Sequence, residues 1–367
     1  MSTVVQGMLD GLGPPLAPMP GDDLRQCELL TESLGVGQEI DDDVAVVVAT
    51  SGTTGTPKGA MLSARALVAS ASATHDRLGG TGTWLLALPT YHIAGLQVLI
   101  RSALAGTVPV ELDVTYGFDP AGLPGAVAAM GSGRRYASLV AAQLAKCLPD
   151  RDALAALADL DAVLLGGGPA PARILEEAAA ADISVVRTYG MSETAGGCVY
   201  DGIPLDGVDV RVEDDGRIVL GGATLAGGYR NPPDPDPFAE PGWFRTDDVG
   251  ALDDSGSLRV LGRADDAIST GGLTVLPQPV ESALATHPAI ADCAVFGVAD
   301  DRLGQRVVAA VVLRPGAAAP GLDELRTHVE ATLPRTAAPR ELHVLDEVPR
   351  RGIGKIDRQA LLTRFGP

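Results

Sequence analysis

The sequence predicts an α/β protein, in which a large N-terminal α/β domain with parallel-type sheets is followed by a small, mobile C-terminal α+β domain. Two observations support this. Short β-branched runs alternate with Ala/Leu-rich segments of helical spacing, which is the pattern of a parallel sheet covered by helices. The chain of 367 residues also has the length of about two domains. We place these domains at residues 1–264 and 265–367.

The elements before residue 200 follow from this alternation. The apolar, β-branched runs expected as strands are Val44–Thr50, Trp84–Leu88, Tyr136–Val140, Ala162–Leu165 and Ile183–Thr188. The segments with helical spacing between them are Ala64–Leu78, Ile93–Ala105 and Ala172–Ala181. Ser63 is a suitable N-cap for the first helix, because its hydroxyl can accept a hydrogen bond from a free backbone N–H group.

The second half of the chain changes in style. Three short runs with Asp- and Gly-containing turns predict an antiparallel sub-region: Val208–Glu213, Arg217–Leu220 and Ser257–Leu261. From Asp265 the expected order is helix Val280–Thr286, strand Asp292–Val298, strand Arg306–Leu313, helix Leu322–Leu333, strand Glu341–Leu345 and helix Asp357–Phe365. The segment Arg314–Gly321 is expected to join a strand to a helix inside this small unit.

Composition excludes several classes of partner. Lys and Arg total 28 against 47 Asp and Glu, and the net charge of −19 would repel nucleic acids and anionic membrane surfaces. The apolar runs are far shorter than the roughly 20 residues that span a bilayer, and the N-terminus has no export signal, so we expect a cytoplasmic protein without membrane insertion. The four cysteines show no Cys-x-x-Cys spacing, which argues against a disulfide framework or a zinc site.

A Gly/Thr-rich segment carries the strongest chemical signal. Thr50, Ser51, Gly52, Thr53, Thr54, Gly55, Lys58 and Gly59 directly follow an apolar run, and backbone N–H groups, hydroxyls and a lysine can together hold phosphate oxygens. A Walker A loop is excluded, because Pro57 precedes Lys58 and Gly59 follows it. A flexible surface loop is the alternative.

Seven motifs in order give this segment a context. After the Ser51–Gly59 loop come Leu88–His92, Gly166–Pro169, Tyr189–Thr194, Trp243–Asp248, Gly262–Asp265 and Gly352–Lys355. In this order the chain resembles the adenylate-forming superfamily of acyl-CoA synthetases, aryl-CoA ligases, luciferases and adenylation domains, from about Val44 to Phe365. The resemblance implies ATP and coenzyme A as co-substrates, Mg²⁺ as cofactor and a small carboxylic acid as the substrate. It leaves a homodimer open.

The resemblance also implies roles for the motif residues. The loop would hold the β- and γ-phosphates, Ser192 would lie near the α-phosphate, and Glu193 would act in catalysis by binding Mg²⁺, a cation that prefers carboxylate and phosphate oxygens. Gly166, Gly167 and Gly168 would leave room for the adenine, on which Tyr189 could stack. Gly190 would line the substrate site.

Two acidic residues compete for the ribose. Asp248 and Arg263 would hydrogen-bond its hydroxyls, but Asp247 replaces the glycine that relatives usually carry before this aspartate. Asp247 rather than Asp248 facing the ribose therefore stays open.

The small domain is expected to move between two half-reactions. Lys355 would bridge the substrate carboxylate and the α-phosphate during adenylation. Asp265 would be the hinge, and Gly271 and Gly272 would face the thiol of coenzyme A afterwards. A plain loop between the domains is the alternative for Asp265.

Features of the segment expected to bind the substrate indicate which carboxylic acid it takes. Only 49 residues precede Thr50, which implies a truncated large domain. This short architecture, with Pro89–Gln97 and Arg101, resembles the 2-succinylbenzoate–CoA ligases of menaquinone biosynthesis. His92 would then be a catalytic and substrate-binding residue, and Arg101 would pair with the second carboxylate, with Arg134 and Arg135 as alternatives. A different acid, a carrier-protein thiol as acceptor, an amidating enzyme, and a non-catalytic adenylate-binding regulator remain alternatives.

Overall fold

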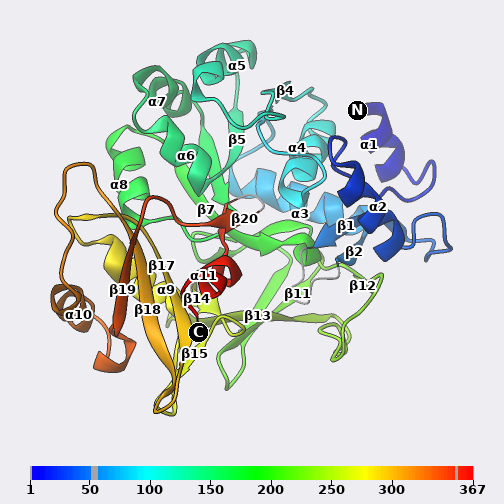
Figure 1. The fold of residues 1–367 in the computed structure, drawn as a ribbon. Coiled ribbons are helices and arrows are strands. Elements are labelled where there is room, and N and C mark those ends of the chain that lie inside the picture. The colour runs from blue at the N-terminus through cyan, green and yellow to red at the C-terminus, as the bar shows by residue number, and fades with distance from the viewer. Residues whose placement is uncertain (1, 51–56, 352–353, 367) are drawn as a thin grey trace.

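A sheet of seven strands forms the centre of the larger part of the molecule (Figure 1). The computed structural model describes residues 2–50, 57–351 and 354–366. The strand order is β4-β3-β5-β6-β7-β8-β9. The strands are β3 (Thr83–Leu86), β4 (Val110–Glu111), β5 (Arg135–Val140), β6 (Ala162–Gly166), β7 (Val185–Met191), β8 (Gly196–Tyr200) and β9 (Ile203–Pro204). Pairing is parallel from β4 to β7 and antiparallel from β7 to β9.

Helices cover both faces of this sheet. Successive side chains of a strand point to opposite faces, and these strands carry apolar side chains on both, so each face needs a covering layer. On one face Trp84 and Tyr136 pack with helices α1 (Ser2–Leu9), α3 (Ala64–Arg77) and α4 (Ile93–Leu104). On the other face Leu85 and Leu139 pack with α5 (Leu123–Ala129), α6 (Ala141–Cys147), α7 (Arg151–Ala158) and α8 (Ala172–Ala180). The predicted cap is present: the Ser63 hydroxyl accepts a hydrogen bond from the Ala66 N–H at 3.1 Å.

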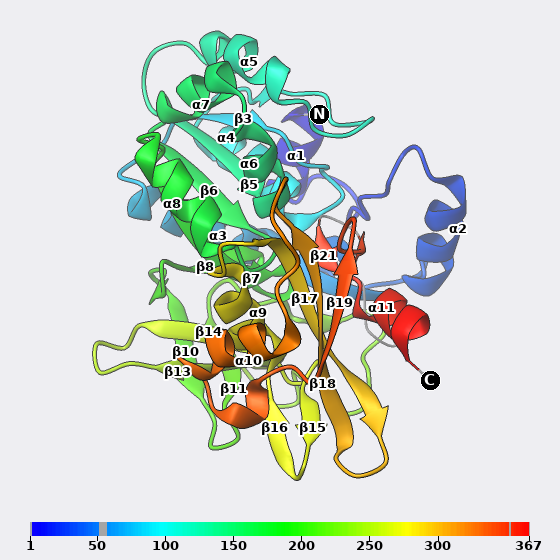
Figure 2. The ribbon, with the colours of Figure 1, turned by 60° about the vertical axis from the view of Figure 1, so that its left-hand side comes forward.

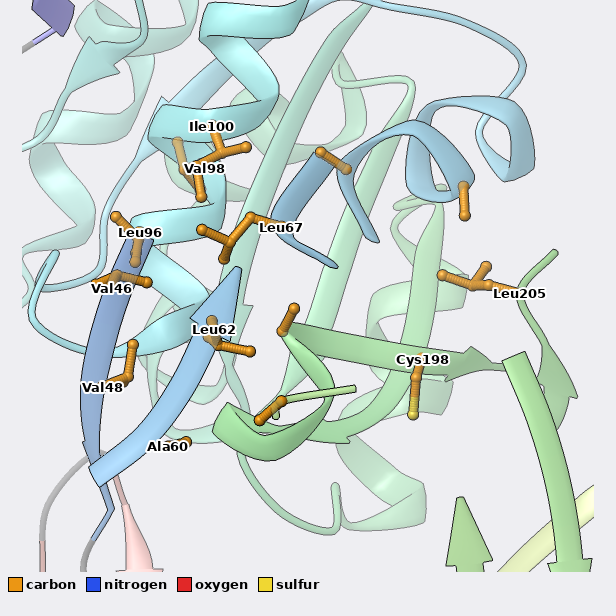
Figure 3. Packing of buried hydrophobic residues seen from close by; sticks show 14 of the residues in the cluster. Val46, Val48, Ala60, Leu62, Leu67, Leu96, Val98, Ile100, Cys198 and Leu205 are labelled. Carbon is orange, nitrogen blue, oxygen red and sulfur yellow. The ribbon is translucent and has the colours of Figure 1, made fainter. Parts of the chain in front are cut away.

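A separate antiparallel sheet packs beside α4. It has the order β1-β2-β12, with β1 (Val44–Thr50), β2 (Lys58–Ser63) and β12 (Gly228–Tyr229). Figure 3 shows Val46 and Val48 of β1, Leu62 of β2 and Leu96 of α4 in one buried cluster. The first predicted strand is therefore correct in its bounds, but it is not part of the parallel sheet. Helix α2 (Leu24–Ser33), with Asp23 as its N-cap, precedes β1.

The antiparallel sub-region predicted after residue 200 is a four-stranded sheet of order β10-β11-β13-β14. Its strands are β10 (Val208–Val212), β11 (Arg217–Gly222), β13 (Trp243–Leu252) and β14 (Leu258–Arg263). The sequence analysis did not predict the ten-residue strand β13, although it carries the Trp243–Asp248 motif.

The smaller C-terminal unit begins after β14 and is an α+β unit, as the sequence predicts. Its sheet contains β15 (Ile268–Thr270), β16 (Leu273–Val275), β17 (Ile290–Asp300), β18 (Gly304–Leu313) and β19 (Glu341–Leu345). Helices α9 (Pro277–Ala285), α10 (Leu322–Glu330) and α11 (Arg358–Phe365) pack on it. A short hairpin, β20 (Arg350–Arg351) and β21 (Lys355–Ile356), precedes α11. The linker Arg314–Gly321 joins β18 to α10, as expected.

The remaining elements are the short 3₁₀ turns η1 (Pro120–Gly122), η2 (Ser192–Thr194) and η3 (Arg335–Ala337). Among the helices that the structure describes, none combines the length and the apolar character that a membrane crossing requires.

Candidate active site

The candidate residues gather where the parallel strands end. Gly166 ends β6, Tyr189 and Gly190 lie near the end of β7, and Glu193 lies in η2 directly after that strand. His92 is the N-cap residue of α4. Ligands of open α/β sheets bind outside the carboxyl ends of the strands, so this is the expected side of the sheet for a binding site.

Glu193 is the most buried acidic residue of the group, with 7% of its surface exposed. The Tyr229 hydroxyl donates a hydrogen bond to its Oε1 at 2.5 Å. Burial raises the pKa of the Glu193 carboxyl, while the hydrogen bond from Tyr229 and the positive charges of Lys355 and Lys58 oppose that rise. A carboxylate in this setting fits Mg²⁺, because this cation commonly binds one or two protein carboxylates together with substrate phosphates. In the described part of the chain, no cluster of three or more His, Cys, Asp or Glu side chains could serve as a complete metal cage.

Lys58 lies on a strand rather than in a loop, which corrects the sequence-based expectation. It is the first residue of β2 and pairs with Thr50, the last residue of β1. Its Nζ lies 5.2 Å from the centre of the Tyr229 ring, where the ring face attracts a cation. The expected phosphate-binding residues Ser51, Gly52, Thr53, Thr54 and Gly55 lie outside the described residues.

Asp248 faces the interior and Asp247 faces solvent. The Tyr189 hydroxyl donates to Asp248 Oδ2 at 2.7 Å, and the exposed fraction of the side chain is 13% for Asp248 against 54% for Asp247. Asp247 instead pairs with Arg217 at 3.0 Å. Burial raises the pKa of Asp248, opposed by the Tyr189 hydrogen bond and by Arg263, whose Nη1 lies 3.7 Å from Oδ1. Asp248 thus lies beside the expected adenine and ribose residues.

Two glycines are packed so closely against neighbouring protein atoms that a side chain would not fit. A Cβ on Gly166 would lie 2.6 Å from Thr188 Oγ1, and a Cβ on Gly190 would lie 2.1 Å from the Gly196 carbonyl oxygen. Gly167 has a positive φ of 83°, and Gly167 and Gly168 are exposed. Ser192 is half-buried next to Glu193. Gly167 and Gly168 therefore present backbone without side chains at the surface, where a flat ligand could bind.

Lys355 acts electrostatically on three site residues from the small unit. Burial and then the charge of Lys355 lower the pKa of His92, and the same charge opposes the rise in the pKa of Glu193 and Asp248. The hairpin that carries Lys355 lies against α6: a Cβ on Gly354 would be 3.6 Å from the Ala142 Cβ. Figure 2 shows β21 close to the larger part of the molecule. This orientation brings the expected adenylation lysine to the site.

Asp265 lies next to Arg263, whereas Gly271 and Gly272 lie away from the other candidate residues. Asp265 is in the turn between β14 and β15, and its carboxylate pairs with the Arg263 guanidinium at 2.8 and 2.7 Å. Gly271 and Gly272 form the exposed turn of the β15–β16 hairpin. That hairpin points away from the seven-stranded sheet (Figure 2), so in this structure the glycine pair is not part of the site.

Arg101 is buried rather than open to a cleft, with 3% of its surface exposed. Its guanidinium lies 4.9 Å from the Trp84 ring centre, and its Nη2 donates to the Tyr200 hydroxyl at 3.4 Å. Among the described residues Nε has no hydrogen-bond partner, and no carboxylate lies within ion-pair distance. The Tyr200 hydroxyl would lie 3.4 Å from a Cβ on Gly197, which pairs with Gly190. Tyr200 thus lies between Arg101 and Gly197, which is the strand partner of the expected substrate residue Gly190.

The alternatives Arg134 and Arg135 do not fit the site. Arg135 begins β5 and pairs with Asp159 at 2.9 Å. Val140, at the other end of β5, lies opposite Gly166. Arg135 and Val140 lie five residues apart on β5, which corresponds to about 16 Å along the strand. Arg135 and its neighbour Arg134 therefore lie at the amino end of the strand, far from the site at the carboxyl end.

The sequence analysis missed Tyr229 and Asn231. Asn231 holds Pro57 and Gly59 on either side of Lys58. Asn231 is the single asparagine of the chain, which is the one signal that could have drawn notice to it. Together with Glu193, Lys58 and Lys355, these residues form a site that can bind a polyphosphate, accept a nucleoside and present a lysine to a reacting carboxylate.

Comparisons with known proteins agree with this geometry. The AMP-binding enzyme family matches residues 20–230, and the AMP-binding enzyme C-terminal domain matches residues 279–355. A probable 2-succinylbenzoate–CoA ligase of Mycobacterium tuberculosis (strain ATCC 25618 / H37Rv) is 69% identical over 363 residues, which cover 98% of this chain and 94% of that protein. The 2-succinylbenzoate–CoA ligase of Geobacillus sp. (strain WCH70) is 34% identical, with 87% and 69% covered.

Solved structures give the same picture. The o-succinylbenzoate CoA synthetase (MenE) from Bacillus subtilis, in complex with the acyl-adenylate intermediate OSB-AMP, has a TM-score of 0.77 and 27% identity, covering 98% of this chain and 81% of that one. ATP-bound MatB from Rhodopseudomonas palustris has a TM-score of 0.78 and 26% identity, covering 90% and 69%.

Proposed function

This chain belongs to the AMP-binding enzyme family, and on that basis we propose that it is an ATP-dependent 2-succinylbenzoate–CoA ligase. The observation that carries the substrate is the 69% identity over 98% of the chain to a probable enzyme of that name. A carboxylate oxygen of the acid attacks the α-phosphorus of ATP, pyrophosphate leaves, and an acyl-adenylate forms. The thiol of coenzyme A then attacks the acyl carbon, loses its proton and releases AMP.

Adenylation depends on charge and position. Negative charge accumulates around the α-phosphate, so fixed positive groups accelerate this step. Lys58 holds the outer phosphates, and Lys355 bridges the attacking carboxylate and the α-phosphate. Glu193 would hold Mg²⁺, which would supply further positive charge at the phosphates. The positive charge of Lys355, which acts on the pKa of both Glu193 and His92, supports this arrangement.

Nucleoside binding uses the interior carboxylate. Asp248 accepts hydrogen bonds from the ribose hydroxyls, Arg263 donates to the same sugar, and Tyr189 stacks on the adenine. The burial of Asp248 beside Tyr189, with Asp247 turned to solvent, supports Asp248 over Asp247.

Thioester formation requires another orientation of the small unit. We assign the rotation to Asp265, and the domain boundary to residues 264 and 265. After rotation Gly271 and Gly272 face the incoming thiol, while Lys355 leaves the site. Hinge motions of this kind concentrate the change in φ and ψ in a few residues between rigid parts.

The second carboxylate of the substrate needs a cation. We assign this cation to Arg101, acting through the Tyr200 hydroxyl, because its guanidinium is buried without an acidic partner among the described residues. His92 lies at the start of the same helix and lines the path of the carboxylate that is activated.

Pyrophosphate release tests this function directly. The purified chain is incubated with ATP and Mg²⁺ and with 2-succinylbenzoate, benzoate or octanoate, each with and without coenzyme A. We expect release with 2-succinylbenzoate, and sustained turnover with coenzyme A. Turnover that favours octanoate or benzoate would refute the substrate. No release with any acid by a chain that binds ATP would favour a regulatory adenylate-binding protein.

Two further properties belong to the proposal. The chain works in the cytoplasm, where its four free cysteines stay reduced. The oligomeric state stays open: in light scattering of the purified chain, a molar mass of two chains would support a homodimer and that of one chain would refute it.

A further inference from the structure

The segment Tyr229–Asn231 lies against the strand that carries Lys58. Strand β12 pairs antiparallel with β2, so that Tyr229 lies opposite Ala60 and Gly228 opposite Met61. The next residue, Arg230, continues this contact, because its N–H donates to the Gly59 carbonyl oxygen at 2.7 Å. The chain after β12 therefore runs directly alongside Lys58.

Asn231 extends the pairing by its side chain. Its Nδ2 donates to the Pro57 carbonyl oxygen at 2.7 Å, and its Oδ1 accepts from the Gly59 N–H at 3.0 Å. The two bonds lie on either side of Lys58 in the chain. Pro232 and Pro233 follow and have no N–H to donate, so the amide of Asn231 supplies the donor that the backbone lacks beyond this point.

Tyr229 contacts the other half of the phosphate machinery. Its hydroxyl donates to Glu193 Oε1 at 2.5 Å, and its ring lies under the Lys58 ammonium. Tyr229 is 7% exposed, as is Glu193, so this bond is shielded from water. One short segment thus contacts both the lysine and the carboxylate.

We propose that Tyr229 and Asn231 are positioning residues, which set the Glu193 carboxylate and the Lys58 backbone for binding of ATP with its metal ion. Neither touches substrate in this role. The proposal rests on the function proposed above. It separates the two residues: Asn231 acts on the lysine and hence on the phosphates, whereas Tyr229 orients a metal-binding carboxylate.

Two nearly isosteric variants remove these bonds. Asn231→Asp keeps the acceptor but replaces the donor by an oxygen that faces the Pro57 carbonyl oxygen. The hydrogen bond to Pro57, on one side of Lys58, is then lost. Tyr229→Phe keeps the ring beneath Lys58 but removes the donor to Glu193. Loss of a hydrogen bond to a metal ligand costs about 10- to 100-fold in metal affinity.

Calorimetric titration of ATP into the full chain, without acid, tests the proposal with and without Mg²⁺. For Asn231→Asp we expect the Kd of ATP to rise by up to about tenfold under both conditions, the scale of one hydrogen bond between neutral groups. For Tyr229→Phe we expect a rise of about tenfold with Mg²⁺ only. The matched controls are Gln305→Glu, an amide that accepts from the Ser269 N–H, and Tyr116→Phe, an almost fully exposed tyrosine.

The outcomes separate this proposal from the proposed function. A wild-type chain that binds no ATP refutes the function. A wild-type chain that binds ATP, together with variants whose Kd is unchanged, refutes only the positioning roles, as does an equal rise for Tyr229→Phe with and without Mg²⁺. If Asn231→Asp does not fold by circular dichroism, Asn231→Ser replaces it, with the same expected rise.

Discussion

Replacing the buried Arg101 by methionine separates substrate recognition from stability. Met fills much of the space of the aliphatic part of the side chain but carries no charge. The Tyr200 hydroxyl keeps its bond to Thr74 Oγ1 at 2.9 Å, so the change leaves no new unpaired hydroxyl.

The stability change follows from opposing contributions. The variant loses a cation–π contact with Trp84, which contributes about 2 kcal/mol or more when desolvated, and a long hydrogen bond to Tyr200 of roughly 0.5–1 kcal/mol. It also removes a buried charge whose desolvation costs several kcal/mol, and burial already lowers the pKa of this guanidinium. We therefore expect the free energy of unfolding to stay within about 1 kcal/mol of wild type or to rise by about 1–3 kcal/mol.

If Arg101 recognises the second carboxylate, activity should fall although stability does not. A hydrogen bond to a charged group contributes about 1.5–3 kcal/mol, so kcat/KM for 2-succinylbenzoate should fall roughly 10- to 150-fold. For the analogue that lacks the aromatic carboxylate, kcat/KM should change little. The assay is pyrophosphate release with both acids, together with urea unfolding of both proteins.

A matched control is Arg135→Met. It removes a positive charge at the amino end of β5, far from the site, and should leave the ratio of the two kcat/KM values unchanged. An unchanged ratio in Arg101→Met would refute its role in recognition. If the free energy of unfolding also fell by more than about 3 kcal/mol, Arg101 would be a structural residue of the core.

Four further outcomes follow from the site. Lys355→Ala should slow acyl-adenylate formation by about 10²–10³, the effect of removing one fixed electrostatic donor, but spare thioester formation from synthetic acyl-adenylate; wild-type adenylation in stopped-flow assays would contradict this. Asp265→Pro fixes φ at the hinge and should impair one half-reaction more than the other, whereas equal losses would place the hinge elsewhere. Burial and then the charge of Lys355 lower the pKa of His92, so its midpoint in a histidine NMR titration should lie below the ordinary value, and Lys355→Ala should raise it. Iodoacetamide should label Cys27 before the buried thiols, among which burial raises the pKa of Cys147 and Cys198 to about 12, and peptide mass spectrometry reads the order.

Apolar periodicity was sufficient for most elements but not for their partners. Val44–Thr50 forms a strand with the predicted bounds, yet it pairs antiparallel with Lys58–Ser63. A continuous apolar run suits a buried strand of either kind, so composition could not separate the two. The partner strand Lys58–Ser63 was not predicted, because Gly59 and Ala60 have weak β propensity. Pairing with β12 stabilises this strand in place of local propensity.

The site divides in the same way. Motif order identified Glu193, Tyr189 and Lys355, because each lies in a short segment with a recognisable pattern. Tyr229 and Asn231 lie outside the seven motifs, and their partners Glu193 and Gly59 are 36 and 172 residues away in the chain. Contacts over such separations depend on how the strands pair, which no local signal in one sequence encodes.

The pair Asp247 and Asp248 illustrates how strand geometry decides what the motif left open. Successive residues of a strand point to opposite faces, so only one of the two carboxylates can point inward. On β13, Asp248 lies opposite Arg263 and reaches Tyr189, and Asp247 therefore turns outward to Arg217 and to the edge of the Arg263 guanidinium. An aspartate is tolerated at this position because two arginines on neighbouring strands, Arg217 and Arg263, pair with it. The departure from the motif thus leaves the inward-facing carboxylate in place and adds charge only on the outer face.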